Sequence, residues 1–418
     1  MLEKLGKKFA FTGATLIDGT GASPLEEATI VVKNGRISEI GNKETVNLED
    51  DIKEINISGH YLTPGLIDTH LHLMGITGTN AIDWVNEANY LQAIRTADEA
   101  RKLLEFGFTT VGSGGSLYDF YLKKAIEEGK VLGPRLMASG RGLTRFPNLD
   151  VRRDVYQIST AEIKEKYPMK YPCSGVEEFR KMTREFIGRG ADIIKTYTTG
   201  AGFWEKDDKN DVHINMNELK TVVKEAHACS VKVAVHCQNL QGIKMAVRAD
   251  ADILIHFDHI HMGEDVTIDE EICEKIANKN IIVAPTISIN FVERWTEEEI
   301  PENQIDSWKL ALEKGVKFAV GSDAFSDSLT PFGEYNANEI KYLVDKIGLS
   351  PLEAITSATK TGAEALGIND KIGTIEEGKI ADLLVLKKDP TENIDVLLDK
   401  QNIKYTVKEG ELKIEHSD

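Results

Sequence analysis

Short apolar segments alternate with amphipathic helical segments from residue 62 onward, and this alternation constrains the fold more than any other feature of the chain. The segments predicted to be strands are Leu62–Leu73, Thr109–Ser113, Arg135–Ser139, Asp192–Thr198, Lys232–His236, Ile253–His256, Ile281–Thr286 and Lys317–Gly321. Among the helical stretches between them are Glu177–Gly188, Asn217–Ala228, Ile268–Asn278 and Ile305–Lys314. Eight such units predict a (β/α)₈ barrel. The alternative, an open doubly wound sheet, would require a glycine-rich dinucleotide turn after the first strand, which the sequence does not contain.

Both ends of the chain have β character instead. Phe9–Leu16, Ala28–Lys33 and Arg36–Ile40 are rich in β-forming residues, and the Asn34-Gly35 pair between the last two predicts a hairpin. Asp382–Leu386 and Tyr405–Lys408 repeat the pattern after the barrel. We therefore expect residues 1–61 and 367–418 to form one small composite β-sandwich, and residues 62–366 to form the barrel.

Charge and cysteine content narrow the setting in which the chain works. The 418 residues include 50 basic and 68 acidic side chains, which gives a formal net charge of −18. Such a surface repels nucleic acids and anionic membranes, so we expect neither as a partner. No apolar run is long enough to span a bilayer, and the N-terminus lacks the apolar core of a signal peptide. The four scattered cysteines predict free thiols and a cytoplasmic protein.

The segment Pro64–His72 is the most informative for chemistry. Asp68, His70 and His72 alternate along a predicted strand and therefore share one face. Two imidazoles on one face suit a divalent transition metal. A His-x-His pair is also compatible with a partly exposed strand that binds nothing.

Ionisable residues also end four other apolar strands. Lys195, His236 and His256 lie at the ends of the fourth, fifth and sixth strands, and Asp323 follows the eighth. A lysine inside a barrel strand is costly unless it is paired or chemically altered. The carboxyl ends of barrel strands meet at one mouth, so these placements predict a metal cage there.

These features together resemble the amidohydrolase superfamily, in the branch of imidazolonepropionase-like and prolidase-like members. The resemblance covers nearly the whole chain and includes Pro64–His72, Lys195, His236, His256, Gly321-Ser322-Asp323 and the late segment Ile372–Leu383. It implies a metal-dependent hydrolase on a (β/α)₈ barrel with a composite β-sandwich. It also implies self-association into a homo-oligomer.

The resemblance assigns a role to each ligand-type residue. His70, His72 and Asp323 would hold one divalent ion, His236 and His256 would hold a second, and Lys195 would bridge both as a carbamate. Asp323 would also move a proton from the attacking water to the leaving nitrogen. Zinc is the expected metal, with manganese, cobalt, iron and a single-ion site as alternatives.

Other residues are candidates for substrate binding. Tyr197 lies two residues beyond Lys195, on the same inward face, where its hydroxyl would bind a substrate carbonyl. Arg141 and Arg145 follow the third strand and would bind a carboxylate. His213, His259 and Trp204 lie on loops near the predicted site, and Trp204 would form an apolar wall with Phe291 and Trp295. For each of these residues, a purely structural role is the alternative.

The sequence predicts the reaction class better than the compound. We expect hydrolysis of a carbon–nitrogen bond in a small molecule, and the leading hypothesis is an amide that has one apolar group, with or without a carboxylate. An N-acyl amino acid, an Xaa-Pro or Xaa-Arg dipeptide, a C-terminal peptide bond, a cyclic amide such as an imidazolone, and an aryl urea or carbamate stay open. Prolidase-like members usually have Gly-Gly-His after the third strand, where this chain has Gly142-Leu143-Thr144. A non-catalytic binding scaffold is the alternative from another class.

Overall fold

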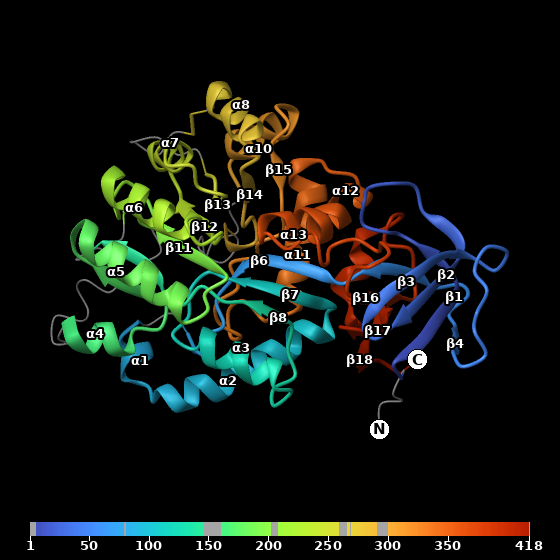
Figure 1. Ribbon diagram of the computed structural model, residues 1–418. Helices are drawn as coiled ribbons and strands as arrows, with labels where there is room; N and C mark the ends of the chain where they lie inside the picture. The colour runs from blue at the N-terminus through green and yellow to red at the C-terminus, as the bar shows by residue number, and fades with distance from the viewer. Residues whose placement is uncertain are drawn as a thin grey trace.

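The fold combines a barrel with a sheet built from both ends of the chain. The computed structural model describes residues 6–78, 81–145, 160–201, 208–258, 266–267, 269–290 and 300–417. Figure 1 shows the barrel with its helices on one side and the terminal sheet on the other. In the terminal sheet, the blue N-terminal strands lie beside the red C-terminal strands.

Each of the eight predicted barrel strands is present. They are β6 (Leu66–Leu71), β7 (Phe108–Ser113), β8 (Arg135–Met137), β11 (Ile193–Tyr197), β12 (Lys232–Cys237), β13 (Ile253–His256), β14 (Ile282–Ala284) and β15 (Lys317–Phe318). Successive strands pair in parallel as β6-β7-β8 and β11-β12-β13-β14-β15. Backbone hydrogen bonds of 2.8 Å join the two groups, from Thr69 N–H to the Val320 carbonyl and from Asp192 N–H to the Ala138 carbonyl. The barrel is therefore closed, as predicted.

Two further strands that the sequence did not predict lie between β8 and β11. They are β9 (Gly142–Arg145) and β10 (Lys170–Cys173), which pair in parallel with Lys170 opposite Gly142. β9 also pairs with β11 through Leu143 and Thr196. These two strands add a wall to the barrel on the side of the third and fourth units.

Helices cover the outside of the barrel (Figure 1). They are α1 (Ala81–Asn86), α2 (Asn89–Glu105), α3 (Asp119–Glu127), α4 (Thr160–Lys166), α5 (Gly175–Gly188), α6 (Met216–His227), α7 (Leu240–Arg248), α8 (Glu270–Asn278), α10 (Glu302–Glu313), α11 (Glu334–Tyr342), α12 (Pro351–Thr356) and α13 (Gly362–Ala365), with π-helical turns η1 (Leu343–Ile347) and η2 (Ser357–Thr361). All four helical stretches named from the sequence form helices, α5, α6, α8 and α10. The start of α6 shows the local cause, because the Asn215 side chain accepts from the Glu218 N–H at 3.1 Å while the Glu218 carboxylate accepts from the Asn215 N–H at 2.8 Å.

The terminal sheet has the strand order β18-β17-β16-β5-β1-β2-β3, with β4 paired to β1. Its strands are β1 (Lys8–Leu16), β2 (Leu25–Lys33), β3 (Arg36–Asn42), β4 (Lys53–Asn56), β5 (Tyr61–Pro64), β16 (Leu383–Leu386), β17 (Ile403–Lys408) and β18 (Glu411–Glu415), with 3₁₀ turns η3 (Ile394–Leu398) and η4 (Lys400–Asn402) between β16 and β17. Antiparallel pairing of β16 with β5 joins the two ends of the chain. The Phe11 and Tyr405 rings stack at 6.3 Å although two strands separate β1 from β17, so the sheet curls over a shared apolar core.

The prediction of one continuous strand over Leu62–Leu73 was wrong. The chain changes sheets at Gly65, because β5 pairs with β16 in the terminal sheet whereas β6 pairs with β7 in the barrel. A Cβ at Gly65 would lie 2.2 Å from the Thr109 hydroxyl, so only glycine fits at this crossing. An unbroken apolar run gives no sign of such a change of partner.

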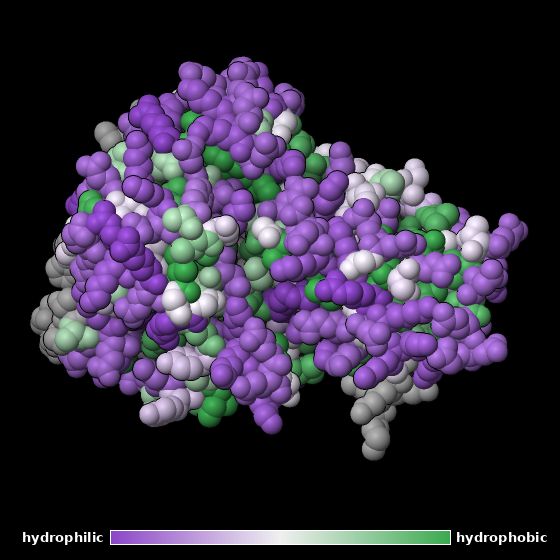
Figure 2. Space-filling model, viewed as in Figure 1, coloured by the Kyte–Doolittle hydropathy of each residue, from purple (hydrophilic) through white to green (hydrophobic). Residues whose placement is uncertain are grey.

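The surface agrees with the composition. The face in Figure 2 is mostly hydrophilic, with small separate apolar patches. All four cysteines are free thiols, and only Cys229 is exposed. Within the described ranges, the helices are too short or too polar to cross a membrane.

Candidate active site

One cavity lies at the carboxyl ends of the barrel strands, and the six residues predicted as metal ligands all line it. Its walls come from His70, His72, Met169, Lys170, Lys195, Tyr197, Ala201, His236, His256, Ile289, Asp323 and Phe325. The ionisable residues at five strand ends therefore lie in the same place, as the strand-end pattern indicated. They come from β6, β11, β12, β13 and the segment after β15.

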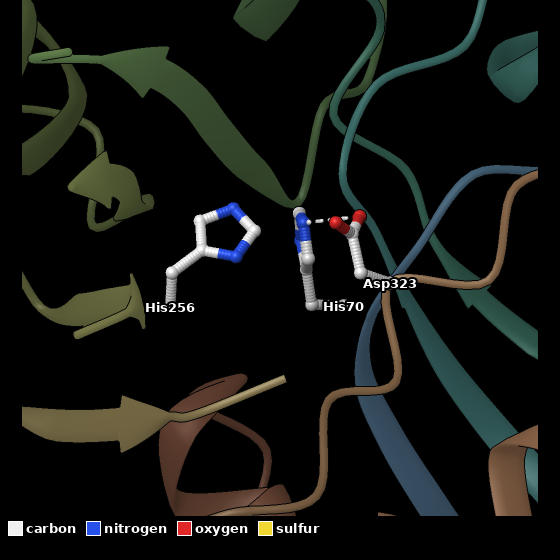
Figure 3. A group of neighbouring side chains, drawn as sticks. All are labelled: His70, His256 and Asp323. Carbon is white, nitrogen blue, oxygen red and sulfur yellow. Dashed lines mark ion pairs between the residues drawn. The ribbon is translucent and has the colours of Figure 1, made fainter. Parts of the chain in front are cut away.

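A carboxylate and two imidazoles converge at one side of this cavity. The Nε2 atoms of His70 and His72 each lie 3.1 Å from Oδ1 of Asp323. Figure 3 shows the His256 ring facing His70, with Asp323 on the far side of His70. One donor atom from each of His70, His256 and Asp323 falls within 4.8 Å of the others. This spacing suits a divalent cation.

The imidazole of His236 lies next to that of His256, with their ring centroids 4.3 Å apart. The His256 Nδ1–H donates to the Thr286 hydroxyl at 2.7 Å, because that hydroxyl gives its own proton to the Pro285 carbonyl at 2.8 Å. The His236 Nε2–H donates to the Gly200 carbonyl at 3.1 Å. These partners leave a lone pair on Nε2 of His256 and on Nδ1 of His236.

The same reasoning applies to His72, whose Nδ1–H donates to the Gly115 carbonyl at 2.9 Å. Its Nε2 lone pair then faces the Asp323 carboxylate oxygen at 3.1 Å. Two electron-rich atoms at this distance repel one another unless a proton or a metal ion lies between them. The donor set therefore fits a cation.

Burial keeps three of these imidazoles, those of His70, His236 and His256, neutral. It lowers the pKa of His70 to about 3, and it lowers the pKa of His236 and His256 well below the usual range. Burial alone would raise the pKa of Asp323, but the neighbouring imidazoles of His70 and His72 hold that pKa well below its ordinary value. Neutral imidazoles and an ionised carboxylate are the forms that bind metals.

Lys195 is the least conventional member of the group. Its side chain is buried, and its Nζ has no hydrogen-bond partner among the described residues. Burial lowers the pKa of its amine to about 7, so much of it is neutral at physiological pH. A neutral, buried amine is a nucleophile and is not suited to a structural ion pair.

Asp68 fixes the backbone beside two of the site residues, His70 and Asp323. Its Oδ1 accepts from the His70 N–H at 2.9 Å and from the Ser322 N–H at 3.2 Å, and its Oδ2 accepts from the Asn336 amide at 2.7 Å. It thereby ties β6 to the segment that contains Asp323. Sequence reasoning found Asp68 but missed Asn336, which lies on α11 without any local signal.

The predicted substrate residues occupy varied positions. Tyr197 lines the cavity with its ring centroid 5.2 Å from that of His236. His213 is buried behind it, with the ring centroids 6.5 Å apart, and its Nδ1 lies 3.2 Å from the Thr144 hydroxyl. His259, Trp204, Phe291 and Trp295 lie outside the described residues.

The two arginines after the third strand are not among the described residues that line the cavity. Arg141 donates to the Tyr167 carbonyl at 3.1 Å and to the Lys164 carbonyl at 2.6 Å, and its guanidinium lies 4.8 Å from the Tyr171 ring centroid. Arg145 ends β9, where its backbone N–H donates to the His213 carbonyl at 2.8 Å. Their substrate roles stay predictions.

Lys170 is a cavity residue that the sequence analysis missed. It begins β10, its side chain is buried, and its Nζ lies 4.4 Å from the Tyr197 ring centroid. Nothing in the local sequence marks it, because β10 has only four residues and includes a proline.

A closed (β/α)₈ barrel with imidazoles, a carboxylate and a buried lysine at its mouth defines a class of metal-binding barrel enzymes. The amidohydrolase family model matches residues 61–413, and the chain belongs to that family. The chain is 26% identical to ochratoxinase of Aspergillus niger over 95% of this chain and 85% of that protein, and 22% identical to imidazolonepropionase of Thermoplasma volcanium over 93% and 91%. A solved prolidase in complex with N-methylphosphonate-L-proline superposes with a TM-score of 0.86 at 26% identity, covering 98% of this chain and 100% of that one.

These findings establish the reaction class. The protein is a metal-dependent hydrolase that acts on carbon–nitrogen bonds. Its family uses divalent metals, and the cavity contains a group of side chains suited to one.

Proposed function

We propose that the protein hydrolyses the amide bond of a small molecule that has an apolar group and a carboxylate, such as an N-acyl amino acid or a dipeptide. The observation that most supports a catalytic site here is the lone pair of His72 Nε2 facing Asp323 at 3.1 Å inside the strand-end cavity. A cation would relieve this opposition and place Lewis acidity next to Tyr197.

The lone pairs of His72, His236 and His256, and the contact of His70 Nε2 with Asp323, indicate which atoms would bind metal. His70 and His72 would bind one ion through Nε2, together with Asp323. His236 through Nδ1 and His256 through Nε2 would hold the second. When bound, the ions supply the Lewis acidity that lowers the pKa of water and polarises the substrate carbonyl. Zinc suits this set of nitrogen and oxygen donors.

Lys195 would complete the set as a carbamate. Its neutral amine forms a nitrogen–carbon bond to carbon dioxide, and the nitrogen then releases a proton, which leaves an anionic oxygen donor. The buried Nζ without a hydrogen-bond partner among the described residues, and its pKa of about 7, support this assignment. Metal reconstitution of the apoprotein should then require bicarbonate, and the variant Lys195→Ala should bind less metal whether or not bicarbonate is present.

The chain's own residues would move the proton and position the substrate. Asp323 would accept a proton from the attacking water and deliver it to the leaving nitrogen. The Tyr197 hydroxyl would donate to the carbonyl oxygen under attack. Met169, Ile289 and Phe325 line the same cavity and would contact an apolar substituent.

The substrate class is tested by a screen of the zinc-loaded protein. N-acyl amino acids and dipeptides represent the proposal, which the ligand of the similar prolidase, a phosphonate derivative of proline, supports. Cyclic amides represent the reaction of the similar imidazolonepropionase, and aryl ureas represent the remaining alternative. We expect the highest kcat/KM for amides with a free carboxylate. A preference for cationic or fully uncharged amides would contradict the proposal.

The setting of the enzyme is also a proposal. We expect a cytoplasmic homo-oligomer, in line with the four free thiols and the resemblance to the family. Light scattering coupled to size-exclusion chromatography measures the oligomeric state, and a mass of one 46.4 kDa chain would contradict it.

A further inference from the structure

Lys170 is a buried cation in the cavity to which no role has been assigned. It is 1% exposed, and it lines the cavity together with the histidines and Asp323. Removing an ammonium group from water costs several kcal/mol unless an anion or a polar partner offsets it. The Tyr197 ring is one such partner, and it holds the Lys170 side chain at the wall of the cavity that contains the proposed metal ligands.

Gly142 and Tyr197 build the wall on which Lys170 lies. Gly142 pairs with Lys170 across β9 and β10, and a Cβ on Gly142 would lie 2.5 Å from Cε2 of Tyr197. The missing side chain lets the Tyr197 ring pack against the Gly142 backbone. The Lys170 Nζ then lies over that ring, 4.4 Å from its centroid, where the ring face attracts a cation.

The charge of Lys170 also reaches the proposed metal ligands. The Nζ atoms of Lys170 and of the proposed ligand Lys195 lie 4.4 Å and 5.1 Å from the centroid of the same Tyr197 ring, and that centroid lies 5.2 Å from the ring centroid of His236. Lys170 is therefore within electrostatic range of the reacting centre. If Lys195 is a carbamate, Lys170 is the ammonium group left among the described residues that line the cavity.

We infer that Lys170 is a catalytic residue that binds the carbonyl oxygen of the scissile amide and stabilises the negative charge that develops there. Water oxygen bonds to the carbonyl carbon, and the π pair of the carbonyl moves onto its oxygen, beside Lys170. The pair returns when the carbon–nitrogen bond breaks and the nitrogen takes the proton from Asp323. No oxidant, reductant or reactant other than water is needed.

The reacting carbonyl is a better occupant than a distant carboxylate for a geometric reason. The Lys170 Nζ lies 4.4 Å from the Tyr197 ring centroid, and that centroid lies 5.2 Å from the ring centroid of the proposed ligand His236, in the same cavity. Donors fixed where charge develops in a transition state affect kcat, and removing one typically costs roughly 10²–10³-fold. This inference rests on the proposed amide hydrolysis.

The test compares wild type with Lys170→Met, which keeps the aliphatic stem and removes the charge. Lys124→Met, on the outer helix α3 with a side chain 74% exposed, is the matched control. With the best amide from the screen, we expect K170M to lower kcat by roughly 10²–10³-fold with little change in KM. Methylphosphonate, a tetrahedral anion, should bind K170M about tenfold or more weakly by calorimetry, because a charge-assisted hydrogen bond is lost. K124M should match wild type in both, and metal content should be unchanged in both variants.

Two kinetic outcomes overturn the assignment. An unchanged kcat, or a raised KM at constant kcat, would show that Lys170 does not act on the transition state. If K170M does not fold or loses its metal, Lys170→Gln repeats the test with a neutral hydrogen-bond donor, and the same failure in K170Q would make Lys170 a structural residue. If wild type hydrolyses no amide, the proposed function fails, while the methylphosphonate comparison still tests Lys170.

Discussion

Replacing Thr286 by valine should weaken metal binding without a change in any ligand. The Thr286 hydroxyl accepts from the His256 Nδ1–H at 2.7 Å, and both side chains are buried. Valine has a methyl group in place of that hydroxyl, so the N–H loses its acceptor at a cost of about 1–3 kcal/mol. The imidazole can then place its proton on Nε2, the atom proposed to face the metal.

The magnitude follows from the same contact. Loss of a group that orients a histidine ligand typically lowers metal affinity by about 10–100-fold, which equals about 1.4–2.7 kcal/mol. Competition with a chromogenic chelator measures this affinity, and elemental analysis gives the metal content per chain. We expect T286V to release metal at lower chelator concentration and to lose activity in proportion.

A serine at the same position is the matched control. Thr286 has a positive φ of 52°, an unfavourable conformation for a β-branched residue, and valine keeps that branching. Thr286→Ser keeps the hydroxyl and removes the branch, so it should bind metal like wild type. If T286V is folded and holds zinc within about twofold of wild type, the assignment of the His256 tautomer is wrong.

Three more substitutions test other parts of the structure. Asp323→Asn should lower kcat by roughly 10²–10⁴-fold while the thermal midpoint is kept; persistent turnover would exclude Asp323 as proton carrier. Burial raises the pKa of Glu99 to about 8, so the contribution of the neutral carboxyl to stability is full below about pH 4.5 and is lost as the pH rises through 8, by about 1.4 kcal/mol per pH unit. The free energy of unfolding of Glu99→Gln in urea should therefore depend less on pH than that of wild type. The same pH dependence in both proteins would refute this. Gly142→Ala, whose Cβ would lie 2.5 Å from the Tyr197 ring, should cost about 1–3 kcal/mol of stability, and no loss in urea unfolding would contradict the close packing.

The barrel was predictable because its strands are apolar runs bounded by helices. Each run maps to a parallel strand, since a strand buried on both faces needs continuous apolar residues. The change of sheet at Gly65 was not predictable, because the run continues while the pairing partner changes. β9 and β10 were missed because four-residue strands with glycine, lysine and proline have no pattern.

The location of the site was predictable for a related reason. The carboxyl ends of parallel strands meet at one mouth whatever the helices do, so His70, Lys195 and Asp323 had to approach one another. Lys170, Asn336 and the loop positions of the arginines depend on segments whose course is set by tertiary packing. The choice of nitrogen on each histidine depends on partners far away in sequence, which only the structure provides.

Three residues at the site have a strained backbone conformation, and hydrogen bonds from helix α11 hold the loops in which two of them lie. His256, Thr286 and Asp323 all have positive φ values, of 76°, 52° and 57°, and each such residue costs about 1–3 kcal/mol. The helix α11 offsets this cost at two loops. Its Asn336 amide binds Asp68 and the Ser322 hydroxyl, at 2.7 and 2.8 Å.

Glu339, three residues further along α11 and thus on the same face, holds the loop after β14. Its carboxylate accepts from the Ile287 and Ser288 N–H groups, both at 2.8 Å, and from the Ser288 hydroxyl at 2.7 Å. One buried helix face therefore fixes the backbone that follows the seventh and eighth strands, where Thr286 and Asp323 lie. Because these hydrogen bonds hold the two loops that carry Thr286 and Asp323 at the cavity, changes on this face of α11 should disturb metal binding before they disturb the fold.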